Sequence, residues 1–307
     1  MWRRDPEETP DESLFEWLEE PTLADSRVLI VGISGMMDAG GAVKIAVDHL
    51  LEHTENRLLA TLDIDLLFDY RARRPRMSFM SDHFEDIDLP EIQLVECIDD
   101  RGTPFLLLHG IEPDLGWGYV VDSLIEMIED QDVNLTVSMQ SFPFPAPHTR
   151  PVAVTAHSTN PDLVAGRTPW VGNMEVPGSL AAFLELQLGR EGHQGIGFAA
   201  HVPQYLANMP HPRSALTLIG EVAGATGLVI STDELRQLAD KADNELNAQI
   251  AENEENQSVV TGLEESFDQL TQQREAMGNL DAAAGEDIAA QVEKFLAEMD
   301  ARGREND

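Results

Sequence analysis

Polar residues that could perform acid and base chemistry cluster in proline-rich segments where predicted strands end. The candidate catalytic groups are Asp38, Glu112, Asp114, His148 and His201. Histidine near a carboxylate permits general acid and base catalysis, and ligands of open α/β sheets bind beyond the carboxyl ends of the strands. The sequence does not fix which strand ends are neighbours, so a structural hydrogen-bonding role is the favoured alternative for each histidine.

Four arginines form a concentrated basic patch at residues 71–76. Their forked guanidinium groups can neutralise carboxylates within the fold or across a subunit interface, which is the interpretation that we favour. They can also bind a phosphate or a carboxylate. Arg71, Arg73, Arg74 and Arg150 are therefore candidate anion-binding residues.

Residues 49–53 match the H-x-x-E-H pattern of inverted zinc proteases. The pattern is short and its specificity is low. On the predicted helix the apolar stripe points inward, which turns Glu52 outward and leaves His49 and His53 at the side, where His53 can favour the helix C-terminus. We expect no metal, and these two histidines are weak zinc candidates.

Two glycine-rich motifs are incomplete. The run GISG at residues 32–35 has Met36 where a nucleophile elbow needs glycine. Residues 35–42 have the glycines of a phosphate loop but lack its Lys and Ser/Thr. We interpret this segment as a strand-to-helix turn, with a small-ligand loop at the helix N-terminus as the alternative. No cofactor and no catalysis are expected.

The elements that must position these residues alternate between strand and helix, which predicts an α/β layer architecture. The sheet is expected to be mixed because some connections are too short for helical crossovers. Strands are predicted at residues 27–33, 57–62, 92–98, 105–109, 133–139, 152–156 and 195–201. Helices are predicted at residues 38–53, 117–129, 179–188 and 214–225.

Composition divides the chain into three parts. Residues 1–26 form an acidic head, predicted to be disordered except for an anchor around Trp17. Residues 27–230 form the α/β core. Residues 231–307 form an acidic helical region, whose apolar stripes are narrow and need a partner surface, and whose last amphipathic segment spans residues 288–299.

Charge and length exclude several classes of protein. The 307 residues carry 56 acidic and 20 basic side chains, a formal charge of -36, which excludes a generic nucleic-acid binder or a protein drawn to anionic membranes. We expect no signal peptide, and no apolar run approaches the roughly 18 residues of a spanning helix. With a single cysteine, Cys97, an internal disulfide is excluded, and we expect a cytoplasmic protein.

Several separated blocks resemble the proteasome assembly chaperone 2 family, in particular its actinobacterial branch. The blocks are IDLLFDYRARRP (64–75), HGIEPDLGWGYVVD (109–122), PHTRPVAVTAHSTN (147–160), MEVPGSLAAFLE (174–185) and HVPQYLANMPHPRSALTLI (201–219). The resemblance spans residues 27–300. It implies a three-layer αβα core of the phosphorylase/hydrolase-like kind, a helical C-terminal region and self-assembly, with a trimer as one form.

The resemblance also favours a function. It implies a protein-interaction or assembly-chaperone factor with a protein partner, either proteasome-related or from another assembly. The chain ends Arg-Glu-Asn-Asp and lacks the hydrophobic-Tyr-x tail through which some archaeal relatives dock on proteasomes. The alternatives are a hydrolase or phosphorylase-like enzyme using the strand-end residues, and a small-anion binding protein centred on the arginines.

Overall fold

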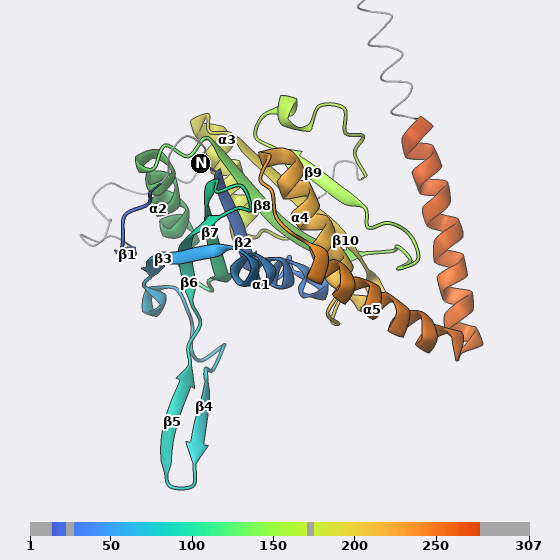
Figure 1. Ribbon diagram of the computed structural model, residues 1–307, viewed down its shortest axis with the longest axis horizontal. Coiled ribbons are helices and arrows are strands. Elements are labelled where there is room, and N and C mark those ends of the chain that lie inside the picture. Colours follow the sequence, from blue (N-terminus) through green and yellow to red (C-terminus); the bar gives the residue numbers. More distant parts are fainter. Residues whose placement is uncertain (1–13, 23–27, 171–174, 277–307) are drawn as a thin grey trace, which may run out of the picture.

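The computed structural model describes residues 14–22, 28–170 and 175–276. Its centre is an eight-stranded sheet in the order β1-β3-β6-β7-β2-β8-β10-β9 (Figure 1). The strands of this sheet are β1 (Phe15–Trp17), β2 (Val28–Ser34), β3 (Glu55–Leu62), β6 (Ile92–Ile98), β7 (Pro104–Ile111), β8 (Leu135–Phe144), β9 (Val154–Ser158) and β10 (Gly195–Pro203). The four central strands β7, β2, β8 and β10 are parallel, and the outer strands pair antiparallel.

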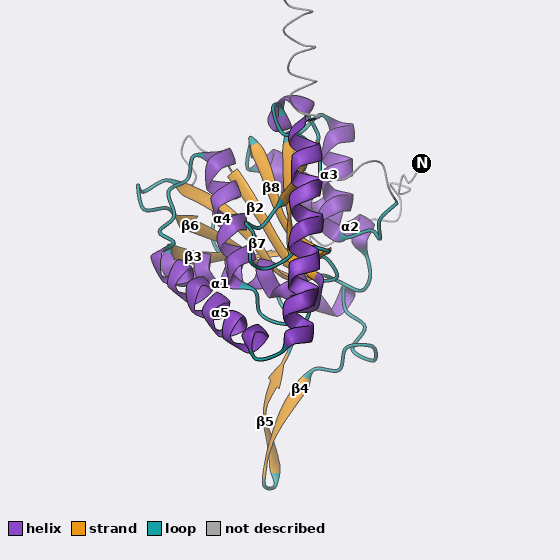
Figure 2. Ribbon diagram, turned by 90° about the vertical axis from the view of Figure 1, so that its right-hand side faces the viewer, coloured by secondary structure: helices purple, strands orange, loops and turns teal. Residues whose placement is uncertain are grey.

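Helices cover both faces of this sheet (Figure 2). On one face lie α2 and α3; on the other lie α1 and α4, and α5 packs against α4. The helices are α1 (Ala42–His53), α2 (Trp117–Asp130), α3 (Leu180–Glu191), α4 (Pro212–Thr226) and α5 (Asp233–Ala251). The predicted three-layer α/β fold with a mixed sheet and a C-terminal helical region is confirmed.

The core consists of two layers because side chains alternate across the central strands. In β2, Leu29 and Val31 pack with α2 and α3, whereas Val28 and Ile30 pack with α1 and α4. A strand covered on both faces needs apolar residues at every position. This explains why β2 reads as a continuous apolar run rather than as an alternating pattern.

Two predicted boundaries differ from the structure by about four or five residues, and the others lie closer. The first long helix begins at Ala42 rather than at Asp38, because Gly40 and Gly41 have positive φ angles of 67° and 56° and interrupt the helix with a tight turn. Strand β8 continues to Phe144, five residues beyond the predicted end, because its last residues pair with β10.

The head contributes one strand that the sequence did not predict. Strand β1 pairs antiparallel with β3 and covers the edge of the sheet. Leu14 and Phe15 are buried there, whereas Trp17 is exposed. The rest of the predicted head, residues 1–13 and 23–26, lies outside the described residues.

The C-terminal region packs onto the same chain. Helix α5 buries Leu235 and Ala239, and a further helix occupies residues 254–276 beyond a short turn. That helix stands beside β9 and β10 at the edge of the molecule (Figure 1). The predicted amphipathic segment at residues 288–299 lies outside the described residues. Within the described residues, no helix has the length and apolar character needed to cross a membrane.

Candidate functional site

The carboxyl ends of the four parallel strands meet at one edge of the sheet, where the predicted catalytic residues lie. Asp38 follows β2. Its Oδ1 accepts a hydrogen bond from the backbone N–H of Val43 at 2.7 Å, and its Oδ2 accepts one from the backbone N–H of Lys44 at 3.3 Å. Burial raises the pKa of Asp38, against the opposing effect of these hydrogen bonds. The carboxylate of Asp38 therefore occupies the helix N-terminus that a small anion would need.

Glu112 follows β7 and performs a similar task for α3. Its Oε1 accepts a hydrogen bond from the backbone N–H of Leu180 at 2.8 Å, and its side chain is buried. The backbone of Gly35 packs so closely that a Cβ there would lie 2.5 Å from Oε2 of Glu112. Gly35 is thus required for this contact and not for a phosphate loop.

Asp114 binds the arginine patch. Its Oδ1 lies 2.8 Å from Nη2 of Arg73, and its Oδ2 accepts a hydrogen bond from the backbone N–H of Asp69. Arg73 also donates to the backbone carbonyl of Glu112 at 3.0 Å. Arg71 and Arg74 are exposed and form no ion pair with another described residue. Arg73 therefore forms contacts within the fold, while Arg71 and Arg74 are exposed to solvent.

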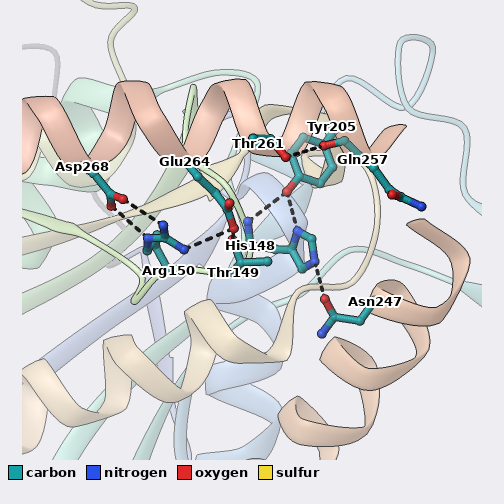
Figure 3. Close-up of polar contacts among 9 residues, drawn as sticks. All are labelled: His148, Thr149, Arg150, Tyr205, Asn247, Gln257, Thr261, Glu264 and Asp268. Atoms are coloured by element: carbon teal, nitrogen blue, oxygen red, sulfur yellow. Dashed lines mark hydrogen bonds and ion pairs between the residues drawn. The ribbon is translucent and has the colours of Figure 1, made fainter. Parts of the chain in front are cut away.

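His148 belongs to a second group, which joins the core to the C-terminal region (Figure 3). Its Nδ1 lies 2.6 Å from the hydroxyl of Tyr205, and its Nε2 lies 3.1 Å from Oδ1 of Asn247 on α5. Both ring nitrogens are engaged by neutral partners, so the imidazole bridges a core loop and α5. No carboxylate of the described residues contacts this ring.

Arg150 holds the helix at residues 254–276 (Figure 3). Its Nε and Nη2 each lie 2.8 Å from an oxygen of Asp268, and its Nη1 lies 3.1 Å from Glu264. The hydrogen bonds with Asp268 raise the pKa of Arg150 and lower that of Asp268. This forked pairing fixes the orientation of the helix. Nε and Nη2, the two guanidinium nitrogens that could bind an anion side by side, are already occupied by Asp268.

His201 lies inside the protein near the end of β10. Its ring packs against Phe142, Phe144 and Trp170, with the Phe144 centroid 4.2 Å away. Nε2 lies 2.8 Å from Oγ1 of Thr155, while Nδ1 has no hydrogen-bond partner among the described residues. Burial lowers the pKa of His201 to about 4. The ring is therefore neutral at physiological pH.

The five catalytic candidates share an edge without forming one constellation. Asp38 is bound to the first turn of α1, Glu112 to α3, and Asp114 to Arg73. His148 and His201 contact other partners, and no hydrogen bond or ion pair joins one candidate to another among the described residues. Each side chain contacts groups of its own fold at a junction between elements.

The two histidines of the H-x-x-E-H pattern stack on each other, with ring centroids 4.2 Å apart. Nε2 of His49 lies 2.7 Å from the backbone carbonyl of Ser231, and Nε2 of His53 lies 3.0 Å from Glu234. That hydrogen bond raises the pKa of His53. The histidines thus join α1 to the segment that starts α5, and the Nε2 of each contacts a different acceptor there.

A projecting hairpin was not predicted from the sequence. Strands β4 (Arg76–Met80) and β5 (His83–Asp88) form a separate two-stranded sheet that extends away from the core (Figures 1 and 2). Met77 pairs with Ile87 and Phe79 with Phe84, and an extra residue at Glu85 shifts the register between these pairs. Directly paired residues share a face, so this bulge places all four apolar side chains on one side.

This apolar face is uncovered. The side chain of Phe79 is 57% exposed and that of Phe84 is 64% exposed, with their rings 5.1 Å apart. An isolated two-stranded hairpin is marginally stable in water. The alternation of Met77 and Phe79 was the one signal in the sequence that could have identified β4.

Comparison with known proteins identifies the family. The model of the PAC2 family matches residues 32–250. The chain belongs to the PAC2 family. The resemblance to actinobacterial relatives seen in the sequence is therefore confirmed. No curated protein matches the chain.

Several solved structures have the same fold as this chain. A Mycobacterium tuberculosis protein of unknown function is 34% identical, with a TM-score of 0.83 over 90% of this chain and 95% of that chain. A protein of unknown function from Corynebacterium glutamicum is 32% identical, with a TM-score of 0.79 over 84% of this chain and 97% of that one. A Mycobacterium tuberculosis proteasome-assembly chaperone homologue is 23% identical, with a TM-score of 0.70 over 76% and 99%.

Proposed function

We propose that this PAC2 protein is a non-enzymatic interaction factor of the assembly-chaperone type, which works in the cytoplasm as a homo-oligomer and acts on a protein partner. The observation that carries the proposal is the uncovered apolar face of the hairpin. Exposed patches of large apolar side chains mark sites where a protein contacts a partner, and the projecting hairpin carries four such side chains.

The positive charge at the base of the hairpin favours a second copy of this chain as the molecule that covers it. Arg71, Arg74 and Arg76 lie at its base and form no ion pair with another described residue. A chain with a formal charge of -36 offers acidic surface to such a patch. Apolar burial would supply most of the binding free energy, and the arginines would orient the contact.

The contacts of the side chains at the strand ends support the non-enzymatic part of this proposal. Its carboxylates cap helices or pair with arginine, and the buried His201 is neutral with aromatic neighbours. A general acid or base must reach the reacting proton. These groups instead contact backbone or side-chain groups of their own fold.

The family supports the kind of partner. One relative with this fold is a proteasome-assembly chaperone homologue. A proteasome α-subunit is therefore the partner that we propose to test first. The test is needed because fold alone does not transfer function.

Self-assembly is tested by measuring molar mass with light scattering across a range of protein concentrations. We expect the full chain to form an oligomer and the Phe79→Ser, Phe84→Ser variant to be a monomer with unchanged circular dichroism. The matched control is Leu115→Ser, Leu186→Ser, because these two leucines lie outside the hairpin and are each 53% exposed, close to the hairpin residues. A wild-type chain that stays monomeric at every concentration contradicts the proposal.

The chaperone role is tested by following the assembly of actinobacterial proteasome α-subunits on native gels. We expect the full-length protein to bind these subunits and to speed their assembly, and the hairpin variant to lose part of this effect. Unchanged assembly without a complex in both low and moderate salt would exclude the proteasome as the partner.

A further inference from the structure

An open groove runs between α1 and α5, on the face of the molecule opposite to α2 and α3. Its volume is about 860 Å³, and its lining includes Ile45 and His49 from α1 and Leu238 from α5. A second hollow of about 360 Å³ continues it toward the loop at residues 206–212. Ile45 and Leu238 line both hollows, so the two form one continuous groove along α5.

The floor of this groove is apolar and open to solvent. Leu238 and Met209 are each 50% exposed, and Leu246 is partly buried. Helix α5 buries Leu235 and Ala239, whereas Leu238 of the same stripe stays half exposed and Ala242 and Leu246 are partly buried. An apolar channel beside a helix suits an amphipathic helix, which places side chains at positions i, i+3, i+4 and i+7 into it.

The rim of the groove is acidic. Asp48 and Glu52 stand on α1, and Glu234, Asp243 and Glu245 stand on α5. Among the described residues that line the two hollows, Lys241 is the one Lys or Arg, and its Nζ lies 3.9 Å from Glu245. Asp48 also contacts Lys44 at 2.6 Å, and Asp243 contacts Arg213 at 2.7 Å. Five carboxylates against Lys241, Lys44 and Arg213 leave an excess of two negative charges, which gives the channel a negative potential.

This charge selects among the possible occupants. A second copy of the chain carries a formal charge of -36, and residues 277–307 of the same chain contain more acidic than basic side chains. Like charges facing each other across an interface oppose binding. We propose that the groove binds a basic amphipathic helix of a partner protein, an inference that rests on the proposed function and names the chemistry of its client.

The test is binding of a fluorescein-labelled peptide to the full chain, measured by fluorescence anisotropy. The probe is an amphipathic helix of Lys, Leu and Ala, roughly 18 residues long to match the length of α5. The comparison peptide keeps the leucines and replaces each Lys with Glu. We expect binding of the Lys peptide that weakens as the salt concentration rises, and no binding of the Glu peptide.

Matched variants separate the groove from the overall charge. Glu52→Lys with Glu245→Lys inverts two rim charges, and Glu126→Lys with Asp130→Lys makes the same change on α2 in the opposite layer. We expect about a tenfold loss of affinity for the groove variant and about twofold for the control.

An apolar pair of variants completes the design. Leu238→Ser removes a floor residue, while Leu186→Ser removes a leucine of α3 that is 53% exposed. We expect about a fivefold loss of affinity for Leu238→Ser and no change for Leu186→Ser.

Equal losses in the two charge variants, equal binding of both peptides, or no binding of the Lys peptide would each overturn the groove proposal. The mass and α-subunit experiments report on the proposed function independently. If the peptide binds the groove but neither self-assembly nor a proteasome complex is found, the proposed function fails while the groove stands. If the α-subunits bind equally well to the groove variant, the groove is not their docking site.

Discussion

The carboxyl edge of the parallel strands and the β4–β5 hairpin differ in whether their side chains find partners within the protein. At the strand edge, Asp38 and Glu112 bind helix N–H groups, and Asp114 binds Arg73. On the hairpin, Phe79 and Phe84 contact each other and otherwise face solvent. Polar residues at strand ends look functional in a sequence, yet here they hold the fold together, while the hairpin leaves large apolar side chains exposed.

The largest expected effect is the loss of stability with acid. The pKa values of His201 and His211 are lowered to about 4 by burial, below the ordinary value of 6.5. The neutral rings therefore favour the folded state above pH 6.5, and this contribution is lost as pH falls from 6.5 toward 4. Each histidine should remove roughly 2 kcal/mol of unfolding free energy between pH 7 and pH 5.

Urea unfolding of the wild type and of His201→Gln at both pH values measures this effect. The glutamine variant should show a smaller difference between the two pH values, because it has one histidine fewer to protonate. An identical pH dependence in both proteins contradicts the assignment to His201.

Removing the buried carboxylate of Glu112 should also cost stability. Glu112→Ala leaves the N–H of Leu180 without its partner and opens a space beside Gly35. We expect a loss of about 2 kcal/mol in the free energy of unfolding, with an unchanged oligomer mass. If Glu112→Ala changed assembly but not stability, the strand edge would be an interaction surface after all.

A smaller, local effect is expected where the core holds the C-terminal helix. Arg150→Ala removes the contacts with Asp268 and Glu264. Amide hydrogen exchange should become faster across residues 254–276 and stay unchanged in β2 and β7, because local opening leaves the central sheet intact. Arg190→Ala, on an exposed arginine of α3, is the control. Faster exchange throughout the sheet would mean that this helix is part of the core.

The smallest effect on stability is expected on the hairpin. Because Phe79 and Phe84 are exposed, Phe79→Ser with Phe84→Ser should change the unfolding free energy of the monomer by under roughly 0.5 kcal/mol. The measurement is urea unfolding at a concentration where wild type and variant are both monomeric. A large loss would show that these rings stabilise the protomer itself, which would remove the contrast with the strand edge.

Local patterns predicted most of the fold. Strand β6 has the predicted bounds, residues 92–98, and α2 begins as predicted at Trp117, because apolar periodicity depends only on neighbouring residues. The hairpin escaped prediction because the bulge at Glu85 spaces Phe84 and Ile87 three residues apart and so breaks the alternation of a strand. Strand β1 is too short to show a pattern.

The site was harder to predict than the fold, since its contacts join residues distant in sequence. Arg150 was a candidate for anion binding, and its partner Asp268 lies 118 residues away. Nothing in the local sequence of either residue indicates the other. The sequence thus identified many residues with strong interactions but not the groups that they bind.

The bulge at Glu85 also affects how copies of the chain could associate through the hairpin. Both long edges of the hairpin carry unpaired backbone groups, and strands joining there could continue without limit as a filament. A bulge bends and twists the strand and so interrupts such pairing, while it gathers the apolar side chains on one face. In the proposed oligomer, contact through that face would leave both edges without intermolecular strand pairing.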